Sequence, residues 1–489
     1  MRRVFSSPVT ALLTGACLRL LFVLKFPAGS GDTVVYQQLA ANWLKLGKYA
    51  MEIGGQPASV DLRMPGYPAF LAIVYALTGR TGESARLFVM LAQLLVDLAA
   101  CLVIAALAAL LVRLCIENSK PKRVFIAALW LAALCPFTVN YVAVPLTETW
   151  AVFLTAIAMS LMVLVATRAS GAKLPFSGWM GASGKDYWKL AALAGFAVGL
   201  GTLFRPETPL LLVTSCAVLG YWQLRRGEWK KWVLTCALMG AACGVALAPW
   251  VIRNALTLHE FQPLAPRNTI LPGEVDPQGF MAWEHTWLYR VRDCYLVPWK
   301  LDDDSINLED IPAAAFDTPD EKARVAMVLE RYNDELSWTS EEDAAFAQLA
   351  RERTARHPAR TYLWIPLRRM VRIWFTPRIE LLPVAGNVFP LAYLHEDDPV
   401  DQRTTIVLFF LNIVYVGLAL WGASKLWQFR AARPALLVMA LYLVVRTAFL
   451  TTLETPEPRY VLVCFPALMA CAAQLAWRRP SQLGATPKL

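Results

Sequence analysis

Long apolar runs, many of them close to 20 residues, recur along most of the 489-residue chain. A helix needs about 20 apolar residues to cross the hydrocarbon core of a bilayer. The pattern therefore predicts an all-α polytopic membrane protein, a bundle of about ten transmembrane helices. The predicted spans are residues 9–27, 86–113, 123–142, 146–167, 188–204, 207–222, 231–252, 404–423, 434–452 and 459–477.

Composition supports this class. Hydrophobic residues make up 57% of the chain and charged residues only 17%, and the mean hydropathy is +0.43. The net charge of +10 would suggest a nucleic-acid partner in a soluble protein, but here it indicates basic loops on the cytoplasmic side of a membrane, and we expect no nucleic acid partner. Most of the ten cysteines lie in apolar runs, where burial as small hydrophobic side chains is expected, and no metal-ligand spacing is present.

The distribution of lysine and arginine predicts the orientation. With ten spans, both chain ends and the loops at 113–123, 168–189 and 223–231 carry the basic residues, so we expect them in the cytoplasm. The first run follows Met1-Arg2-Arg3 without a convincing cleavage site, which indicates an uncleaved signal anchor in the inner or plasma membrane.

Two long segments then lie on the outer, periplasmic or extracellular side. In the first, residues 28–84, Val35 to Leu46 has the spacing of an interfacial helix, and Gly66 to Leu77 is too short to span. The second, residues 253–403, is expected to form a small helical cap. Its predicted parts are helices at 318–335 and 340–356 with Asp317 and Ser340 as N-caps, and an interfacial helix over 362–375. Cys294 is the only cysteine of this segment, so no disulfide is expected within it.

The chain is thus expected to have three parts. Residues 1–252 would form an N-terminal transmembrane catalytic module that includes the first outer loop. Residues 253–403 would form the outer cap, and residues 404–489 the C-terminal transmembrane helices and a cytoplasmic tail.

Asp32 is the strongest candidate for chemistry, because it follows the first span almost at the membrane surface. A carboxylate there is suited to take a proton from an acceptor hydroxyl during attack on a lipid-anchored substrate. The alternative is a helix N-cap, since aspartate is favoured at that position. Glu148 opens a later span on the same side, where it is either a second catalytic acid or a stabilising charge at a helix N-terminus.

Several arginines share that side. An ammonium or guanidinium group near a departing phosphate stabilises its charge, so we expect these residues to bind a lipid phosphate. The candidates are Arg63, Arg205, Arg253 and Arg459. For Arg205 the alternative is an ion pair with Glu207, and Arg446, which lies inside a span, is expected either in the site or paired with an acid such as Glu454. Tyr36, Trp43 and Tyr67 are candidates for stacking on a sugar.

These pieces, in their order along the chain, resemble the GT-C membrane glycosyltransferases, in particular the branch with the protein O-mannosyltransferases and the lipid A aminoarabinose transferase. The matching segments are Gly31-Asp32, Arg63-Met64-Pro65-Gly66-Tyr67-Pro68, Leu146-Thr147-Glu148, Gly201 to Pro206, Pro249 to Asn254 and Pro458-Arg459-Tyr460.

The resemblance implies an inverting transferase that moves a hexosyl or pentosyl group from a polyprenyl-phosphate donor to a lipid or glycan acceptor. Asp32 matches the catalytic aspartate, Arg63 a phosphate-contacting residue and Glu148 an acidic position near the site. Thr33 stands where the mannosyltransferase branch usually has a second acid, which argues against protein O-mannosylation. Family members differ in their use of a divalent metal, and this sequence supplies no clear ligand set, so no cofactor is assigned.

A transporter or flippase of a lipid-linked saccharide is the alternative function. Transporters often contain internal repeats, and none is found in this chain.

Overall fold

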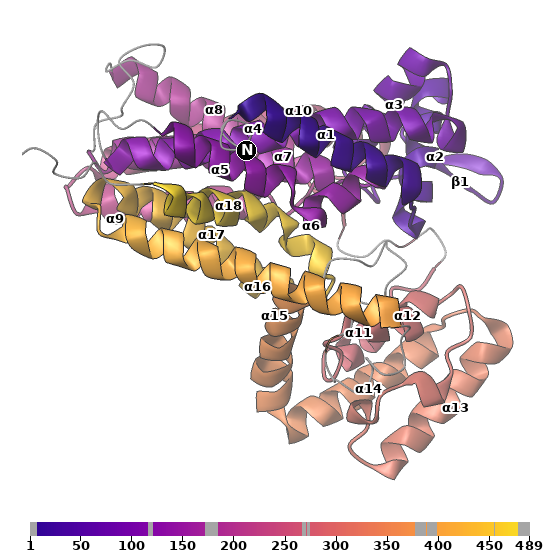
Figure 1. Cartoon of the computed structure of the whole chain (residues 1–489). Helices are drawn as coiled ribbons and strands as arrows, with labels where there is room; N and C mark the ends of the chain where they lie inside the picture. The colour runs from indigo at the N-terminus through magenta and orange to yellow at the C-terminus, as the bar shows by residue number, and fades with distance from the viewer. Residues whose placement is uncertain are drawn as a thin grey trace, which may run out of the picture.

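The computed structural model describes residues 7–115, 121–171, 184–266, 270, 274–376, 388, 399–453 and 455–477. Most of them are helical, and the long helices run side by side in one bundle (Figure 1). The helices of the bundle are α1 (Pro8–Lys25), α4 (Arg86–Cys115), α5 (Lys122–Ala133), α7 (Glu148–Ala169), α8 (Gly184–Thr202), α9 (Pro209–Leu224), α10 (Trp229–Thr257), α16 (Pro399–Trp427), α17 (Arg433–Leu450) and α18 (Phe465–Ala472).

Each of the ten predicted spans coincides with one of these helices, and the all-α class is confirmed. Within the described residues, seven helices are long and apolar enough to cross a bilayer, and the bent pair described next makes eight. The shortfall from ten comes from α8, which falls outside this set, and from α9, which has 16 residues. Both pack against α7 and α10.

The predicted span at 123–142 is broken. Helix α5 ends at Ala133, and the chain continues at 48° in the short helix α6 (Pro136–Val139) and the 3-10 turn η2 (Asn140–Ala143). Proline has no N–H for the preceding helical turn, so Pro136 is the cause of the bend.

The first outer segment has two helices joined by a small hairpin. Helix α2 (Gly31–Leu46) and helix α3 (Gly66–Thr78) were predicted as interfacial segments. The 13 residues of α3 rise about 20 Å, less than the roughly 30 Å core of a bilayer. The hairpin of β1 (Ala50–Ile53) and β2 (Gln56–Ser59) was not predicted. Its two-residue turn is Gly54-Gly55, both at positive φ, as this turn requires.

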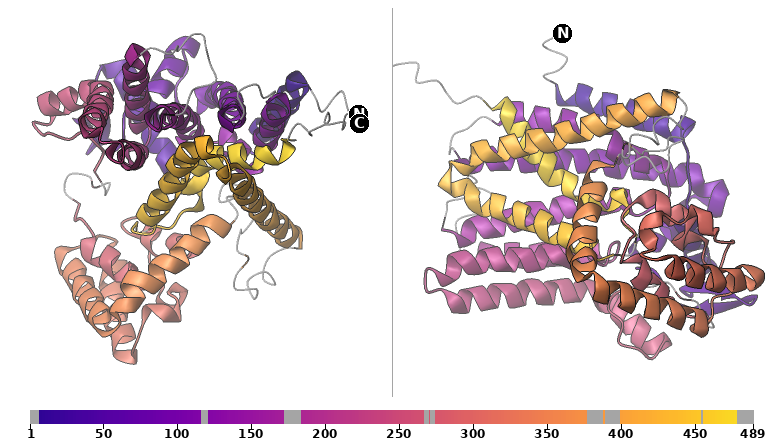
Figure 2. Two further views of the ribbon diagram at one scale, coloured as in Figure 1. Left: turned by 90° about the vertical axis from the view of Figure 1, so that its left-hand side faces the viewer. Right: turned by 90° about the horizontal axis from the view of Figure 1, so that it is seen from below.

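The second outer segment forms the expected helical cap, at the bundle end that also carries α2 and the hairpin (Figures 1 and 2). It contains α11 (Gln278–Glu284), α12 (Val291–Leu296), α13 (Pro319–Glu335) and α14 (Ser340–Arg356), with the 3-10 turns η3 (Pro298–Lys300), η4 (Leu308–Asp310) and η5 (Ala313–Ala315). Its core is rich in aromatic side chains, among them Trp283, Trp287 and Phe346, and Cys294 is a buried free thiol.

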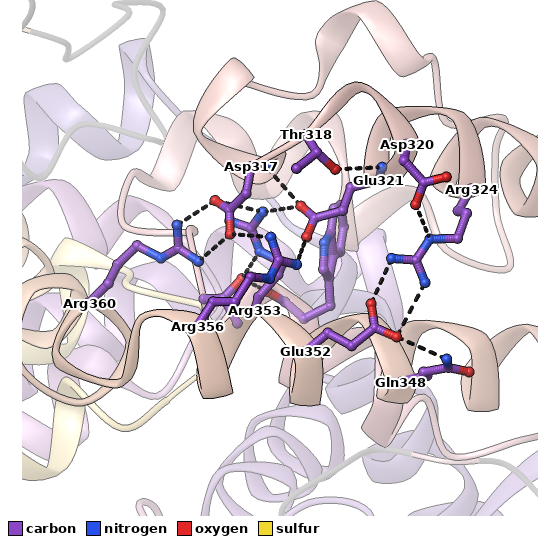
Figure 3. A network of polar contacts seen from close by, with 12 residues as sticks. Asp317, Thr318, Asp320, Glu321, Arg324, Gln348, Glu352, Arg353, Arg356 and Arg360 are labelled. Carbon is purple, nitrogen blue, oxygen red and sulfur yellow. Dashed lines mark hydrogen bonds and ion pairs between the residues drawn. The ribbon is translucent and has the colours of Figure 1, made fainter.

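The two helix caps predicted here were wrong by one residue. Thr318 caps α13 and Thr339 caps α14, in place of Asp317 and Ser340. The Asp317 carboxylate instead joins an ion network between the helices, where it accepts from Arg360 and Arg353 (Figure 3). Arg353 belongs to α14 and Arg360 to the helical turn that follows it, so the network fixes both to the start of α13.

The chain leaves the cap through a five-residue π-helical turn, η6 (Arg360–Trp364), and the amphipathic helix α15 (Ile365–Phe375). The fully buried Arg369 anchors α15, since it donates to the carbonyls of Leu288 in the cap and Thr451 beyond α17, at 2.7 and 3.2 Å. After α17, the 3-10 turn η9 (Pro458–Cys464) leads into α18, which ends in η10 (Ala473–Ala476).

Candidate active site

A network of arginine and carboxylate side chains lies where the first outer segment meets the ends of α7, α9, α17 and η9. It contains four arginines and four carboxylates, so its formal charge is zero. Its members are Arg63, Arg205, Arg446, Arg459, Asp32, Glu148, Glu207 and Glu457. Charged groups this well enclosed are stable only when paired, and here each one has a partner.

Asp32 lies in the first turn of α2. The N-cap of that helix is Ser30, whose backbone N–H donates to the Thr33 hydroxyl, so the N-cap alternative for Asp32 is wrong. One oxygen of Asp32 accepts from Arg63 at 2.7 Å and the other from Arg459 at 3.3 Å. Burial would raise the pKa of the Asp32 carboxyl, but the two guanidinium groups outweigh it and hold this pKa below its ordinary value.

Arg63 is held at the foot of the hairpin. The Tyr49 hydroxyl donates to the Arg63 carbonyl at 2.8 Å, and the Arg63 side chain turns to Asp32. Gly66 then brings this strand of the loop against the turn that carries Arg205: its N–H donates to the Leu203 carbonyl at 2.7 Å, and a Cβ at Gly66 would meet that carbonyl oxygen at 2.6 Å. A side chain at this position would push the two arginine-bearing loops apart.

Glu148 begins α7 and is almost fully buried, with 3% of its surface exposed. It accepts from Arg205 at 2.8 Å and lies 3.7 Å from Arg459. The expected Arg205–Glu207 pair is present at 3.9 Å, but it is secondary to the contact with Glu148.

Arg459 is the shared member of the network. It contacts three carboxylates: Glu457 at 2.5 Å, Asp32 at 3.3 Å and Glu148 at 3.7 Å. The Tyr460 ring lies beside it and beside Arg205, with the guanidinium carbons 5.5 and 5.0 Å from the ring centroid, and its hydroxyl donates to Glu457.

Arg446 of α17 closes the network on the bundle side. Its acidic partner is Glu207, at 3.0 Å, and it also donates to the Tyr460 carbonyl. The partner suggested from the sequence, Glu454, lies outside the described residues. Burial would raise the pKa of Glu207, but Arg205 and Arg446 outweigh it and lower this pKa.

Arg253 is not brought into the network. Its guanidinium donates to the carbonyls of Val60 and Tyr49 at 2.8 and 2.7 Å, and it lies over the rings of Tyr49 and Trp250. It therefore fastens the foot of the hairpin to α10, and through Tyr49 it supports the loop that carries Arg63.

The three aromatic candidates differ in position. Tyr36 lies close enough to Asp32 to be influenced by its charge, and burial, with that charge, raises its pKa to about 12. Tyr67 is fully buried against Tyr36 and donates to Gln93 at 2.6 Å. Trp43 packs against Tyr49 in a separate hydrophobic cluster.

In the part of the chain that the structure describes, no three histidine, cysteine, aspartate or glutamate side chains gather as a metal site would require. The acids of the network face arginines instead. Among these acids, Glu457 was missed from the sequence. Its position between two prolines, two residues before Arg459 at the start of a span, is the signal that could have found it.

Comparison with known proteins places the fold. No family model and no curated protein sequence matches the chain. Among solved structures, it is similar to the apo form of the oligosaccharyltransferase from Archaeoglobus fulgidus, with 14% identity and a TM-score of 0.50 over 95% of this chain. This chain spans half the length of that enzyme.

Two further structures match with lower TM-scores. The same archaeal enzyme, AglB, in complex with an inhibitory peptide and a dolichol-phosphate gives a TM-score of 0.46 at 14% identity, over 95% of this chain and 50% of that one. ArnT from Cupriavidus metallidurans bound to undecaprenyl phosphate gives 0.39 at 13% identity, over 96% of this chain and 77% of that one. The helical bundle therefore shares its fold with the apo oligosaccharyltransferase.

Proposed function

We propose that this protein is a multi-pass membrane glycosyltransferase that moves a sugar from a polyprenyl-phosphate donor to an acceptor hydroxyl, with inversion at the anomeric carbon. The observation that carries the proposal is the pairing of Asp32 with Arg63 and Arg459 at one end of a GT-C-like bundle. A base and phosphate-binding cations are the two requirements of this reaction, and they are in contact here.

In this scheme the arginines must exchange partners when the donor binds, because each is already paired with a carboxylate. A donor phosphodiester adds one negative charge to a network whose formal charge is zero. It therefore binds by taking Arg63, Arg459 or both from Asp32, and Arg205 remains oriented by Glu148 at 2.8 Å. The weaker of the two Asp32 contacts, to Arg459 at 3.3 Å, is the easier to exchange.

Donor binding then prepares the base. In the free protein the two guanidinium groups lower the pKa of Asp32, which makes it a weak proton acceptor. Once the phosphate attracts those groups, the pKa of Asp32 rises and the carboxylate is released toward the acceptor.

The chemical step is a single displacement. The acceptor oxygen forms a bond to the anomeric carbon, its proton passes to Asp32, and the bond from that carbon to the phosphate oxygen breaks with its electron pair on the departing polyprenyl phosphate. Arg63, Arg205 and Arg459 stabilise the charge that develops on that phosphate. Glu148 acts by positioning Arg205 and Arg459, and Tyr36 lies one turn along α2 from Asp32, on the same face of that helix. We place the site on the outer face of the membrane, as the basic loops predict.

Envelope glycans and glycolipids from cells with and without the gene provide the test, with cells that express the Asp32→Asn variant as the third sample. A glycan modification measured by mass spectrometry should be present only with the wild-type protein. Deletion of a flippase would also remove the modification, but Asp32→Asn would then be expected to behave as wild type. That pattern would contradict the proposal.

A further inference from the structure

A groove lies on the surface of the bundle, at the end remote from Asp32. This groove of about 270 Å³ runs between α16, α17 and α18, and its lining includes Ala419, Leu420, Trp427, Leu436, Ala440 and Leu443. Leu420 and Trp427 are 67% and 47% exposed, so the groove opens on the outer surface of the bundle. From Leu436 to Leu443 it follows α17 for about 10 Å.

The groove is closed toward the active-site end. The face of α17 that lines the groove continues one helical turn beyond Leu443, to Thr447. There Trp374 of α15 donates to the Thr447 hydroxyl at 3.0 Å, and Asn412 of α16 donates to the Trp374 carbonyl. The groove is therefore separate from the network that contains Asp32.

Its other end is basic. The Arg433 guanidinium lies 5.6 Å from the centre of the Trp427 ring, and its Nε donates to the Trp427 carbonyl at 3.0 Å. Lys425 lies on the other face of α16, over the ring of Trp421, which is not part of the groove lining. Among the described residues, Arg433 has no acidic partner, and the exposed Arg430 lies in the turn between the two helices.

We propose that this groove binds an anionic phospholipid, with an acyl chain between α16 and α17 and the phosphate head group at Arg433. An acyl chain gains little from the groove alone, because the surrounding bilayer is equally apolar. Selectivity must come from the head group, and a cation without an acidic partner beside the Trp427 ring favours a negative one. The site lies in the leaflet that the basic loops assign to the cytoplasm.

The test uses the full-length purified protein in detergent with equimolar dioleoyl phosphatidylglycerol and dioleoyl phosphatidylcholine, and native mass spectrometry counts the bound lipid. The wild-type protein should retain phosphatidylglycerol over phosphatidylcholine. Arg433→Gln should reduce that retention about fivefold, the effect of one cation near an anionic head group. Equal retention of the two lipids by the wild-type protein would overturn the proposal.

Three variants separate this site from general attraction and from misfolding. Arg433→Lys keeps the charge and should retain the lipid. Arg225→Gln removes an arginine that also lies over an aromatic ring, Tyr221 at 4.3 Å, but away from the groove, and it should change nothing. Ala440→Phe fills the groove with all charges intact and should reduce retention. An Arg225→Gln loss as large as that of Arg433→Gln, or no loss with Ala440→Phe, would place the lipid elsewhere.

Discussion

Arg459 offers a test of how the charge network operates. After substitution with glutamine, Asp32 still pairs with Arg63 and Glu148 with Arg205. Glu457 loses its arginine partner, since Arg459 is the only one that it has within the described part of the chain. Glu457 is 6% exposed. Loss of one partner from a buried pair costs about 3–5 kcal/mol. Because two of the three carboxylates keep another arginine, we expect a value near the lower end, about 3 kcal/mol.

Donor affinity should fall in the same variant for a different reason. A charge-assisted contact to phosphate contributes about 1.5–3 kcal/mol, so its loss raises the donor KM roughly tenfold to a hundredfold. The double variant Arg459→Gln with Glu457→Gln separates the two effects. Removal of both charges restores the balance of the network and should recover most of the thermal stability, but it cannot restore the phosphate contact.

The assay therefore measures apparent Tm and donor KM for the two single variants, the double variant and the wild-type protein. Arg226→Gln is the matched control, since Arg226 pairs with Glu228 at 3.3 Å on the surface, where an ion pair contributes about 0–1 kcal/mol. A double variant with wild-type donor KM would refute the reasoning, because Arg459 would then serve only to neutralise Glu457.

Three other predictions concern the arginines, the pH dependence and the topology. Arg63→Ala and Arg205→Ala should each raise the donor KM by about tenfold or more. Arg253→Ala decides between two roles: phosphate binding raises the donor KM in an intact protein, whereas anchoring of the hairpin appears as faster proteolysis of residues 50–59. The lowered pKa of Asp32 means that its charged form, and the ion pairs that it makes, persist as pH falls until this lowered pKa is reached. The fall of kcat/KM at acid pH should therefore occur below about pH 4, the ordinary pKa of aspartate. The fall of kcat should occur at a higher pH, because bound donor raises the pKa of Asp32. A fall of kcat/KM that begins above about pH 5 would contradict this. On a cysteine-free background, a cysteine at Lys122 should resist external labelling, and labelling there would reverse the predicted topology.

Hydrophobic periodicity was sufficient to predict where the helices lie, because the length of an apolar run is set by the bilayer itself. It also identified α2 and α15 from their amphipathic spacing, and α3 from an apolar run that is too short to span. It could not predict the hairpin of β1 and β2, a short polar segment whose strands are stabilised by contacts with the distant Arg253. The bend after α5 was signalled by Pro136, but a single proline within an apolar run does not reveal its angle.

The candidate site was only partly predictable, since its members are far apart in the chain. Five candidates were selected because they lie in the first outer segment or at the outer end of a span. The structure brings all five together: Asp32, Arg63, Glu148, Arg205 and Arg459. The sequence gives no reason to pair Arg446 with Glu207, 239 residues away. It also could not separate Arg253 from the other arginines, because only the fold shows that backbone carbonyls occupy its guanidinium.

The most direct test of the central claim is the single-turnover transfer rate of purified Asp32→Asn protein, with donor binding measured on the same preparation. Asn keeps the shape of the side chain, and Ser30 still caps α2, so the variant should fold. It cannot accept the acceptor proton, so transfer should fall by about 10²–10⁴, the usual contribution of a general base. Donor binding should be unchanged or tighter, because Arg63 and Arg459 no longer have to leave a carboxylate. A folded Asp32→Asn protein that transfers sugar at a near-normal rate would contradict the account and move the search for the base to Glu148.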